Sequence, residues 1–189
     1  MFKSYFNLHL KPAQDIPRWD VLGRAWREVH RAGAKSAIPF AVAFPEWMKN
    51  GYTVGDVLRV FVLDTEQANR LCDAIEPVLD EGDIATVSRV LDVPEKAGVW
   101  EAYRMRRLSG PVSKNRKTVL LDAAIEMRHQ ANSHQRKLQA SLPFVWMRSG
   151  SGQKFKLVIE RVAGDPLWQG EPNGYGLSRA TQMIGLPVL

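Results

Sequence analysis

Apolar and polar residues alternate along the first segment of the chain. Even positions between Phe2 and Leu10 are apolar with one exception, and the odd positions are largely polar. A period of two with one apolar face predicts a strand over these residues. From Pro17 the apolar residues recur at helical spacing instead, which predicts a helix that ends near Gly33.

The next segments complete a familiar order of elements. Residues 38–44 and 57–63 are short apolar runs that predict strands. Asp64 can cap a second amphipathic helix, and residues 84–93 predict a fourth strand that stops at Pro94. The order strand, helix, strand, strand, helix, strand is that of the ferredoxin-like split arrangement, an antiparallel sheet with both helices on one face.

The pattern changes after about residue 95, where we place a domain boundary. The segments predicted beyond it are a strand over 103–108 with cations on one side, a helix over 119–139, strands over 142–147 and 155–162 joined by the turn 149–153, and a loop or short strand over 174–178. The expected fold class is α+β. A ferredoxin-like (RRM-like) domain over 1–95 precedes a smaller, basic α+β domain over 96–189, although the strands of the first domain lack an RNP-like aromatic motif.

Charge is concentrated in this second half. The chain of 189 residues carries a net charge of +6, with 26 Lys and Arg against 20 Asp and Glu. Between Arg104 and Lys156 there are 12 basic and 2 acidic residues, a local balance of +10, whereas the remainder has a balance of −4. Such segregation is typical of a face that binds a polyanion, usually nucleic acid, although a solvated basic surface is the alternative.

Composition excludes several other classes. No apolar run approaches the ~18 residues that a membrane span needs, and the N-terminus lacks the pattern of a signal peptide. Cys72 is the only cysteine, so there is no internal disulfide and no thiolate zinc cluster. We therefore expect a cytoplasmic protein without a membrane, metal or other cofactor.

Three segments carry a resemblance to a known family. The densest is Leu142-Pro-Phe-Val-Trp-Met-Arg-Ser149, followed by Gly-Ser-Gly-Gln-Lys-Phe155-Lys-Leu-Val-Ile. Tyr175-Gly-Leu-Ser178 lies near the C-terminus, and His30 is followed by Val42-Ala-Phe-Pro45. In this order and spacing they resemble the subtype I-F CRISPR repeat endoribonuclease, the Csy family of crRNA-processing enzymes, over essentially the whole chain.

The resemblance implies a catalytic group. RNA can be cut by its own 2′-hydroxyl, and a histidine suits the proton transfer because its side chain titrates near neutral pH. His30 lies at the border of the apolar stripe of its helix, which alone favours a half-exposed surface histidine. The resemblance instead implies that His30 is catalytic, that Ser149 positions the attacked ribose, and that Tyr175 orients His30. From the residues alone, Ser149 is also typical of a turn and Tyr175 of packing.

The resemblance also implies RNA contacts. Phe155 would stack beneath the base pair at the foot of a hairpin, with a core phenylalanine as the alternative. Arg104 and Arg106 would read bases, although Arg106 stands where the family has glutamine. Ser151 lies in the same turn as Ser149 and is the weaker candidate of the two serines for a contact with the RNA. The remaining RNA-binding candidates, mostly expected to meet phosphates, are Arg107, Lys114, Arg116, Lys117, Arg128, Arg136, Lys137 and Gln153. The helix after Lys117 is less basic than that of the family.

These observations favour a metal-independent endoribonuclease that binds a CRISPR repeat hairpin, cleaves at its 3′ base and remains bound to the crRNA 3′ hairpin. By resemblance its partners are the other subunits of the type I-F surveillance complex. The alternatives are a subunit that binds the hairpin with little or no cleavage, and an unrelated ferredoxin-like RNA chaperone. No tight cluster of Asp, Glu and His supports a metal-dependent nuclease.

Overall fold

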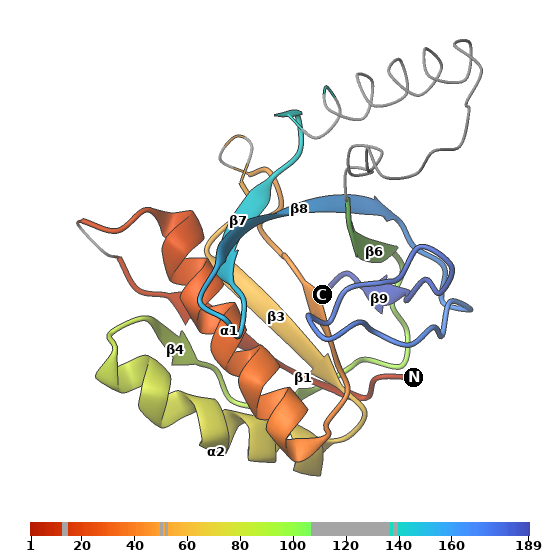
Figure 1. Ribbon diagram of the computed structural model, residues 1–189. Coiled ribbons are helices and arrows are strands. Elements are labelled where there is room, and N and C mark those ends of the chain that lie inside the picture. The colour runs from red at the N-terminus through yellow and green to blue at the C-terminus, as the bar shows by residue number, and fades with distance from the viewer. Residues whose placement is uncertain (13–14, 50, 52, 107–136, 138–139) are drawn as a thin grey trace, which may run out of the picture.

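The computed structural model describes residues 1–12, 15–49, 51, 53–106, 137 and 140–189. It has a mixed α+β fold with two antiparallel sheets (Figure 1). The elements in chain order are β1 Ser4–Leu10, α1 Arg18–Ser36, β2 Phe40–Ala43, β3 Val57–Val62, α2 Thr65–Glu81, β4 Ala85–Val87, β5 Leu91–Asp92, β6 Trp100–Met105, β7 Phe144–Arg148, β8 Lys154–Ala163 and β9 Leu186–Pro187.

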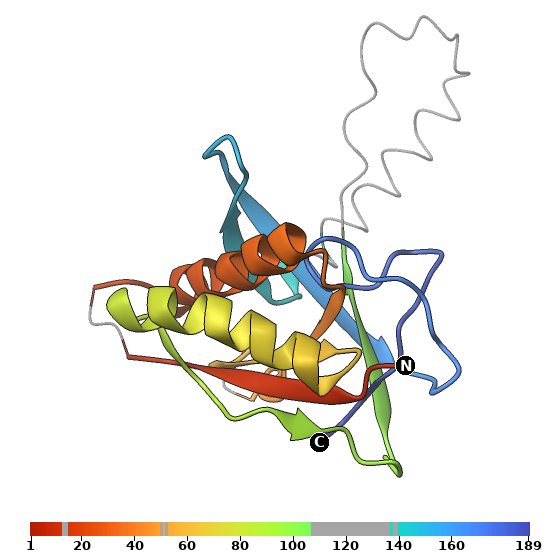
Figure 2. The same cartoon turned by 90° about the horizontal axis from the view of Figure 1, so that it is seen from below.

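The first sheet has the strand order β2-β3-β1-β4, and β5 also pairs with β1. Each pair is antiparallel. Both helices lie in front of this sheet in Figure 1 and above β1 in the turned view of Figure 2, and they pack against each other. Asp64 caps α2 as predicted, since its side chain accepts a hydrogen bond from the backbone N–H of Gln67 at 2.8 Å. The alternating pattern of β1 and the apolar runs of β2 and β3 therefore located these three strands to within two residues.

The helix α1 extends beyond its predicted end near Gly33. It continues to Ser36, and Ala37 then adopts a left-handed conformation with φ 53°. Gly33 is needed for packing rather than for ending the helix, because a Cβ there would meet the Phe40 ring at 2.8 Å. A glycine that admits a neighbouring ring has the same sequence signature as one that ends a helix.

The single strand predicted over residues 84–93 is wrong. Two short strands, β4 and β5, replace it, and both pair with β1. Between them, the Ser88 hydroxyl accepts a hydrogen bond from the Asn7 N–H at 2.9 Å while the Ser88 N–H donates to the Asn7 carbonyl at 2.8 Å. A side-chain oxygen thus takes the place of a backbone acceptor and interrupts the ladder.

The second sheet has the order β7-β8-β6-β9 and contains the most basic described strands. β6 begins three residues earlier than predicted, at Trp100, and pairs with both β8 and the unpredicted β9. β7 and β8 form the expected hairpin, which crosses α1 in Figure 1. α1 contacts β7 directly, so the helix that carries His30 and the hairpin that carries Ser149 are packed together.

Buried side chains from both sheets form a continuous core. It includes Phe6 and Trp26 before residue 95, and Tyr103, Met147 and Leu177 after it. The domain boundary near residue 95 stays a prediction. No helix in the described part of the chain is long and apolar enough to cross a membrane.

Candidate active site

His30 is held at the C-terminal half of α1 by a hydrogen bond and a ring contact. Its Nδ1 lies 2.5 Å from the carbonyl oxygen of Gly174. Its ring stacks on that of Tyr175, with centroids 4.7 Å apart and planes at 29°. These two contacts come from a segment 144 residues downstream, so the tertiary fold creates a pairing that local sequence does not contain.

The loop around Tyr175 is rigidly organised. The Asn173 side chain accepts hydrogen bonds from the N–H groups of Tyr175 at 2.8 Å and Leu177 at 3.2 Å, an Asx-type turn. Trp26 Nε1 donates to the Tyr175 carbonyl at 2.9 Å. Gly176 has φ 77°, and a Cβ there would meet Phe40 at 2.8 Å. The glycine therefore permits both the left-handed turn and its close packing.

Phe155 extends this arrangement to the β7–β8 hairpin. Its ring meets that of Tyr175 edge to face, with centroids 6.1 Å apart. Phe155 pairs across the hairpin with the buried Met147 and is itself only partly buried. The structure thus brings Phe155, Tyr175 and His30 into one row of rings, although these residues lie in three distant parts of the sequence.

Ser149 lies in the turn of the same hairpin. Its hydroxyl accepts a hydrogen bond from the Gln153 N–H at 3.1 Å and lies 2.9 Å from the Ser151 hydroxyl. Within the described part of the chain, these side-chain hydrogen bonds stay inside the turn, and none joins Ser149 to His30. The structure therefore places the two serines and Gln153 together in one turn.

Arg104 lies in β6 and Arg106 directly follows its last residue, and both bind Glu160 on β8. Arg104 Nε donates to the carboxylate at 2.6 Å, and Arg106 Nη2 donates to it at 2.8 Å. Partial burial alone would raise the pKa of Glu160, but hydrogen bonds from Arg106 and Arg104 and their charges outweigh it and lower this pKa. The same hydrogen bond raises the pKa of Arg106.

Comparison with known families identifies the chain. The family model described as CRISPR-associated protein (Cas_Csy4) matches residues 5–185. The chain belongs to the Cas_Csy4 family. No curated protein matches it. The Cas_Csy4 family is a CRISPR repeat-processing endoribonuclease family, so membership implies CRISPR crRNA processing and binding of CRISPR repeat RNA. The suspected resemblance is confirmed.

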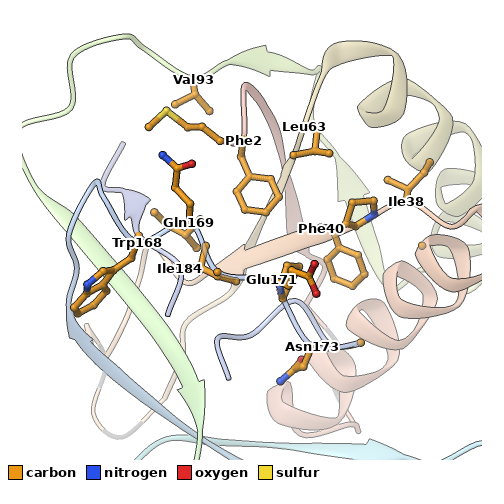
Figure 3. A pocket seen from close by; sticks show the side chains of 18 of the residues that line it. Phe2, Ile38, Phe40, Leu63, Val93, Trp168, Gln169, Glu171, Asn173 and Ile184 are labelled. Carbon is orange, nitrogen blue, oxygen red and sulfur yellow. The ribbon is translucent and has the colours of Figure 1, made fainter. Parts of the chain in front are cut away.

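A cavity adjoins the histidine of this Cas_Csy4 family member. Its volume is about 650 Å³, and His30 and Gly174 line one side of it. The other walls are mostly apolar. Figure 3 shows Phe2, Phe40 and Ile184 around the cavity. His30 thus contacts the Tyr175 ring and also borders an open space.

Several predicted RNA contacts of this family member lie outside the described residues. They are Arg107, Lys114, Arg116, Lys117, Arg128 and Arg136. The helix predicted over 119–139 falls almost entirely in the same part of the chain. Among residues that the structure does describe, no group of three or more His, Cys, Asp or Glu side chains is arranged to hold a metal ion.

Sequence reasoning missed two partners of the candidate site. The Gly174 carbonyl that binds His30 is a backbone atom, so no residue type indicates it. Glu160 stands opposite Arg104 in the β6–β8 register. The strand pattern of 155–162 placed Glu160 on one face, but only the pairing of β8 with β6 brings it to the two arginines.

Proposed function

We propose that the protein is a metal-independent endoribonuclease that cleaves a CRISPR repeat hairpin at its 3′ base, through attack of a ribose 2′-hydroxyl on the adjacent phosphate. The observation that carries this proposal is the hydrogen bond between His30 Nδ1 and the Gly174 carbonyl. A carbonyl oxygen only accepts hydrogen bonds, so Nδ1 is the donor. In the neutral ring, Nε2 then holds an unprotonated lone pair that can accept a proton.

The proposed reaction uses that lone pair. Nε2 of His30 takes the proton of the 2′-hydroxyl while O2′ forms a bond to phosphorus. The bond from phosphorus to O5′ of the next nucleotide breaks, O5′ takes a proton from water to become a 5′-hydroxyl, and His30 then returns its proton to the solvent. The products are a 2′,3′-cyclic phosphate and a 5′-hydroxyl. Such proton transfer typically contributes about 10²–10⁴-fold to the rate.

The neighbouring residues have positioning roles in this proposal. Tyr175 stacks on His30 and fixes the plane of its ring. Phe155, at the other end of the row of rings, would carry the last base pair of the hairpin by stacking. Ser149 would bind the attacked ribose from its turn. Arg104 would read an adjacent base from β6, and Arg106, the second predicted base reader, would hold Arg104 in position through Glu160.

Fold and assembly belong to the same proposal. The order β2-β3-β1-β4, with antiparallel pairs and both helices on one face, supports a ferredoxin-like arrangement in the first half. We propose that the second sheet, with the basic segment after it, supplies the RNA-binding part. The enzyme would stay on its product hairpin and join a crRNA-guided surveillance complex.

The second candidate is a subunit that binds the hairpin with little or no cleavage. It is favoured by the turn around Ser149, whose side-chain hydrogen bonds in the described residues are all internal and do not reach His30. If the Ser149 hydroxyl keeps these partners with RNA bound, it is engaged within its turn and does not position the ribose.

A cleavage assay separates the two candidates. Purified protein is incubated in EDTA with a labelled repeat hairpin, alongside His30→Ala and a substrate with a 2′-deoxy nucleotide upstream of the cut. We expect the wild type to cleave the unmodified hairpin. We expect no cleavage by His30→Ala and none of the 2′-deoxy substrate. Cleavage that persists with either change would refute the mechanism. Tight binding without cleavage by the wild type would favour the binding subunit.

A further inference from the structure

The outer face of the β7–β8 hairpin carries aromatic rings and cations side by side. In the antiparallel register, Trp146 faces Lys156 and Arg148 faces Lys154. Alternate residues of a strand point to the same face, so Phe144 belongs to this face as well. We call the set of Trp19, Phe144, Trp146, Arg148, Lys154 and Lys156 the hairpin strip.

The members of the hairpin strip are in direct contact. The Lys156 ammonium lies 3.9 Å from the centre of the Phe144 ring, and the Lys154 ammonium lies 4.9 Å from the centre of the Trp146 ring. Trp19, at the start of α1, extends the strip with its ring centroid 6.1 Å from that of Phe144. Aromatic faces attract cations in this geometry, so the rings hold the ammonium groups in place on the surface.

The strip is accessible and positively charged. Arg148, Lys154 and Lys156 are exposed, and Trp19 is 43% exposed. The carboxylate of Asp20 binds Lys154 at 3.1 Å. Interleaved aromatic and basic side chains are the combination that single-stranded nucleic acid needs, because bases stack on the rings while phosphates meet the cations.

The strip also continues the candidate base-reading face. Glu160 and Arg104 are paired in the β8–β6 register, and paired residues point to the same face of a sheet. Lys156 lies four residues before Glu160 on β8 and so shares that face with Arg104. Neighbouring strands are about 4.8 Å apart, so the face runs about 10 Å from β6 to β7. Phe155 points to the opposite face, toward Tyr175. RNA held by Arg104 would therefore reach the strip by crossing β8.

From these contacts we propose that the hairpin strip binds single-stranded RNA that directly flanks the repeat hairpin. This inference rests on the proposed function, in which Phe155 marks the end of the duplex. Along a strand, Lys154 and Lys156 are about 6.6–6.8 Å apart, comparable to the separation of adjacent phosphates in an extended strand. The flank lies on either the 5′ or the 3′ side of the duplex, and the chemistry of binding is the same for both.

Binding measurements test this assignment. The RNAs are the bare hairpin, the hairpin with a 5′ single-stranded extension, the hairpin with a 3′ extension and a 2′-deoxy block at the cut, and an unstructured RNA of equal length. The proteins are the wild type, Lys154→Gln/Lys156→Gln, and Lys3→Gln/Lys96→Gln as a control with the same charge change at exposed positions outside the strip. The Kd is measured by fluorescence anisotropy over a range of salt concentrations.

We expect one extension to tighten wild-type binding severalfold over the bare hairpin, and the arm that does so identifies the flank. The strip variant should lose this gain, bind the bare hairpin like the wild type, and show a salt slope for the extended RNA that is smaller by about 1.4, because each single-strand phosphate contact contributes about 0.7. The control variant should keep the gain. A 4-thiouridine in the extension should crosslink to the peptide that contains Trp146.

Three outcomes would overturn the assignment. One is no gain from either extension. Another is that the strip variant binds the bare hairpin and the extended hairpin with equally weakened affinity, which would mean that the strip contacts the duplex. The third is retention of the gain by the strip variant. If the protein does not recognise the hairpin at all, the proposed function fails. The strip assignment is then tested on the unstructured RNA, which the strip variant should bind more weakly than the control variant does. Binding of the unstructured RNA by the strip variant as tight as that by the wild type would refute the strip assignment independently of the proposed function.

Discussion

Substitution of Gly23 by alanine tests the contact between α1 and the β7–β8 hairpin, on which the geometry of the site depends. A Cβ at Gly23 would lie 1.9 Å from the carbonyl oxygen of Trp146. Ordinary contact begins at 3.4 Å, so helix and strand would have to separate by about 1.5 Å. The atom it meets is backbone and cannot rotate away. Overpacking of this kind costs about 1–3 kcal/mol.

A gain in helix propensity partly offsets this cost. Alanine in a helix interior is about 0.8–1 kcal/mol more favourable than glycine, so we expect a net loss of up to about 2 kcal/mol in the free energy of unfolding. Urea unfolding measures it. Gly98→Ala is the control, because a Cβ there meets nothing within 4 Å and should change stability by less than about 0.5 kcal/mol. A clash of this depth with backbone belongs at the upper end of the overpacking range, about 3 kcal/mol, so the expected net loss is about 2 kcal/mol. If Gly23→Ala is as stable as the control, the helix does not approach β7 this closely.

Three further predictions concern single side chains. Tyr175→Ala removes the stack on His30, worth about 0.5–1.5 kcal/mol, and should slow single-turnover cleavage by roughly 2–10-fold; an unchanged rate would exclude orientation by Tyr175. The stabilisation by Glu160 is present above its ordinary pKa of 4.5 and is lost as pH falls through its lowered folded pKa. The urea stability difference between the wild type and Glu160→Gln should therefore shrink in acid, and a constant difference would contradict this. Burial raises the pKa of the Cys72 thiol to about 12, so a disulfide reagent should modify native protein far more slowly than unfolded protein; equal rates would show an accessible thiol.

The elements of the first half could be predicted because their signals are local. The period-two pattern of β1 and the Asp64 cap of α2 each depend on a few adjacent residues. The interruption at Ser88 could not be predicted in this way. It arises because the Ser88 hydroxyl accepts a hydrogen bond from Asn7, 81 residues away in the sequence. Serine is compatible with a continuous strand, so only the pairing decides the outcome.

The candidate site shows the same division. His30, Phe155 and Tyr175 were selected through a family resemblance, and the structure brings their rings into one row. Residue type alone would have left His30 as a half-exposed surface histidine. The tautomer of His30 could not be predicted from the sequence, because it depends on a hydrogen bond to a backbone carbonyl that only the folded loop places beside the ring. The proposed catalytic property is thus a product of tertiary structure.

The arginine at position 106, where the resemblance implies glutamine, acquires a physical role from Glu160. Two neighbouring guanidinium groups repel each other, and the shared carboxylate offsets that repulsion and orders both side chains. Ordering a long side chain on binding costs about 0.5–1.5 kcal/mol, so under the proposed function this arrangement would lower the cost of binding RNA. Glu160 contacts Arg104 through Nε, whereas it contacts Arg106 through both Nη2 and Nε. The terminal nitrogens of Arg104 keep the geometry that meets guanine O6 and N7. We infer that Arg104 reads the base and that Arg106 acts by completing the ion pair that positions it.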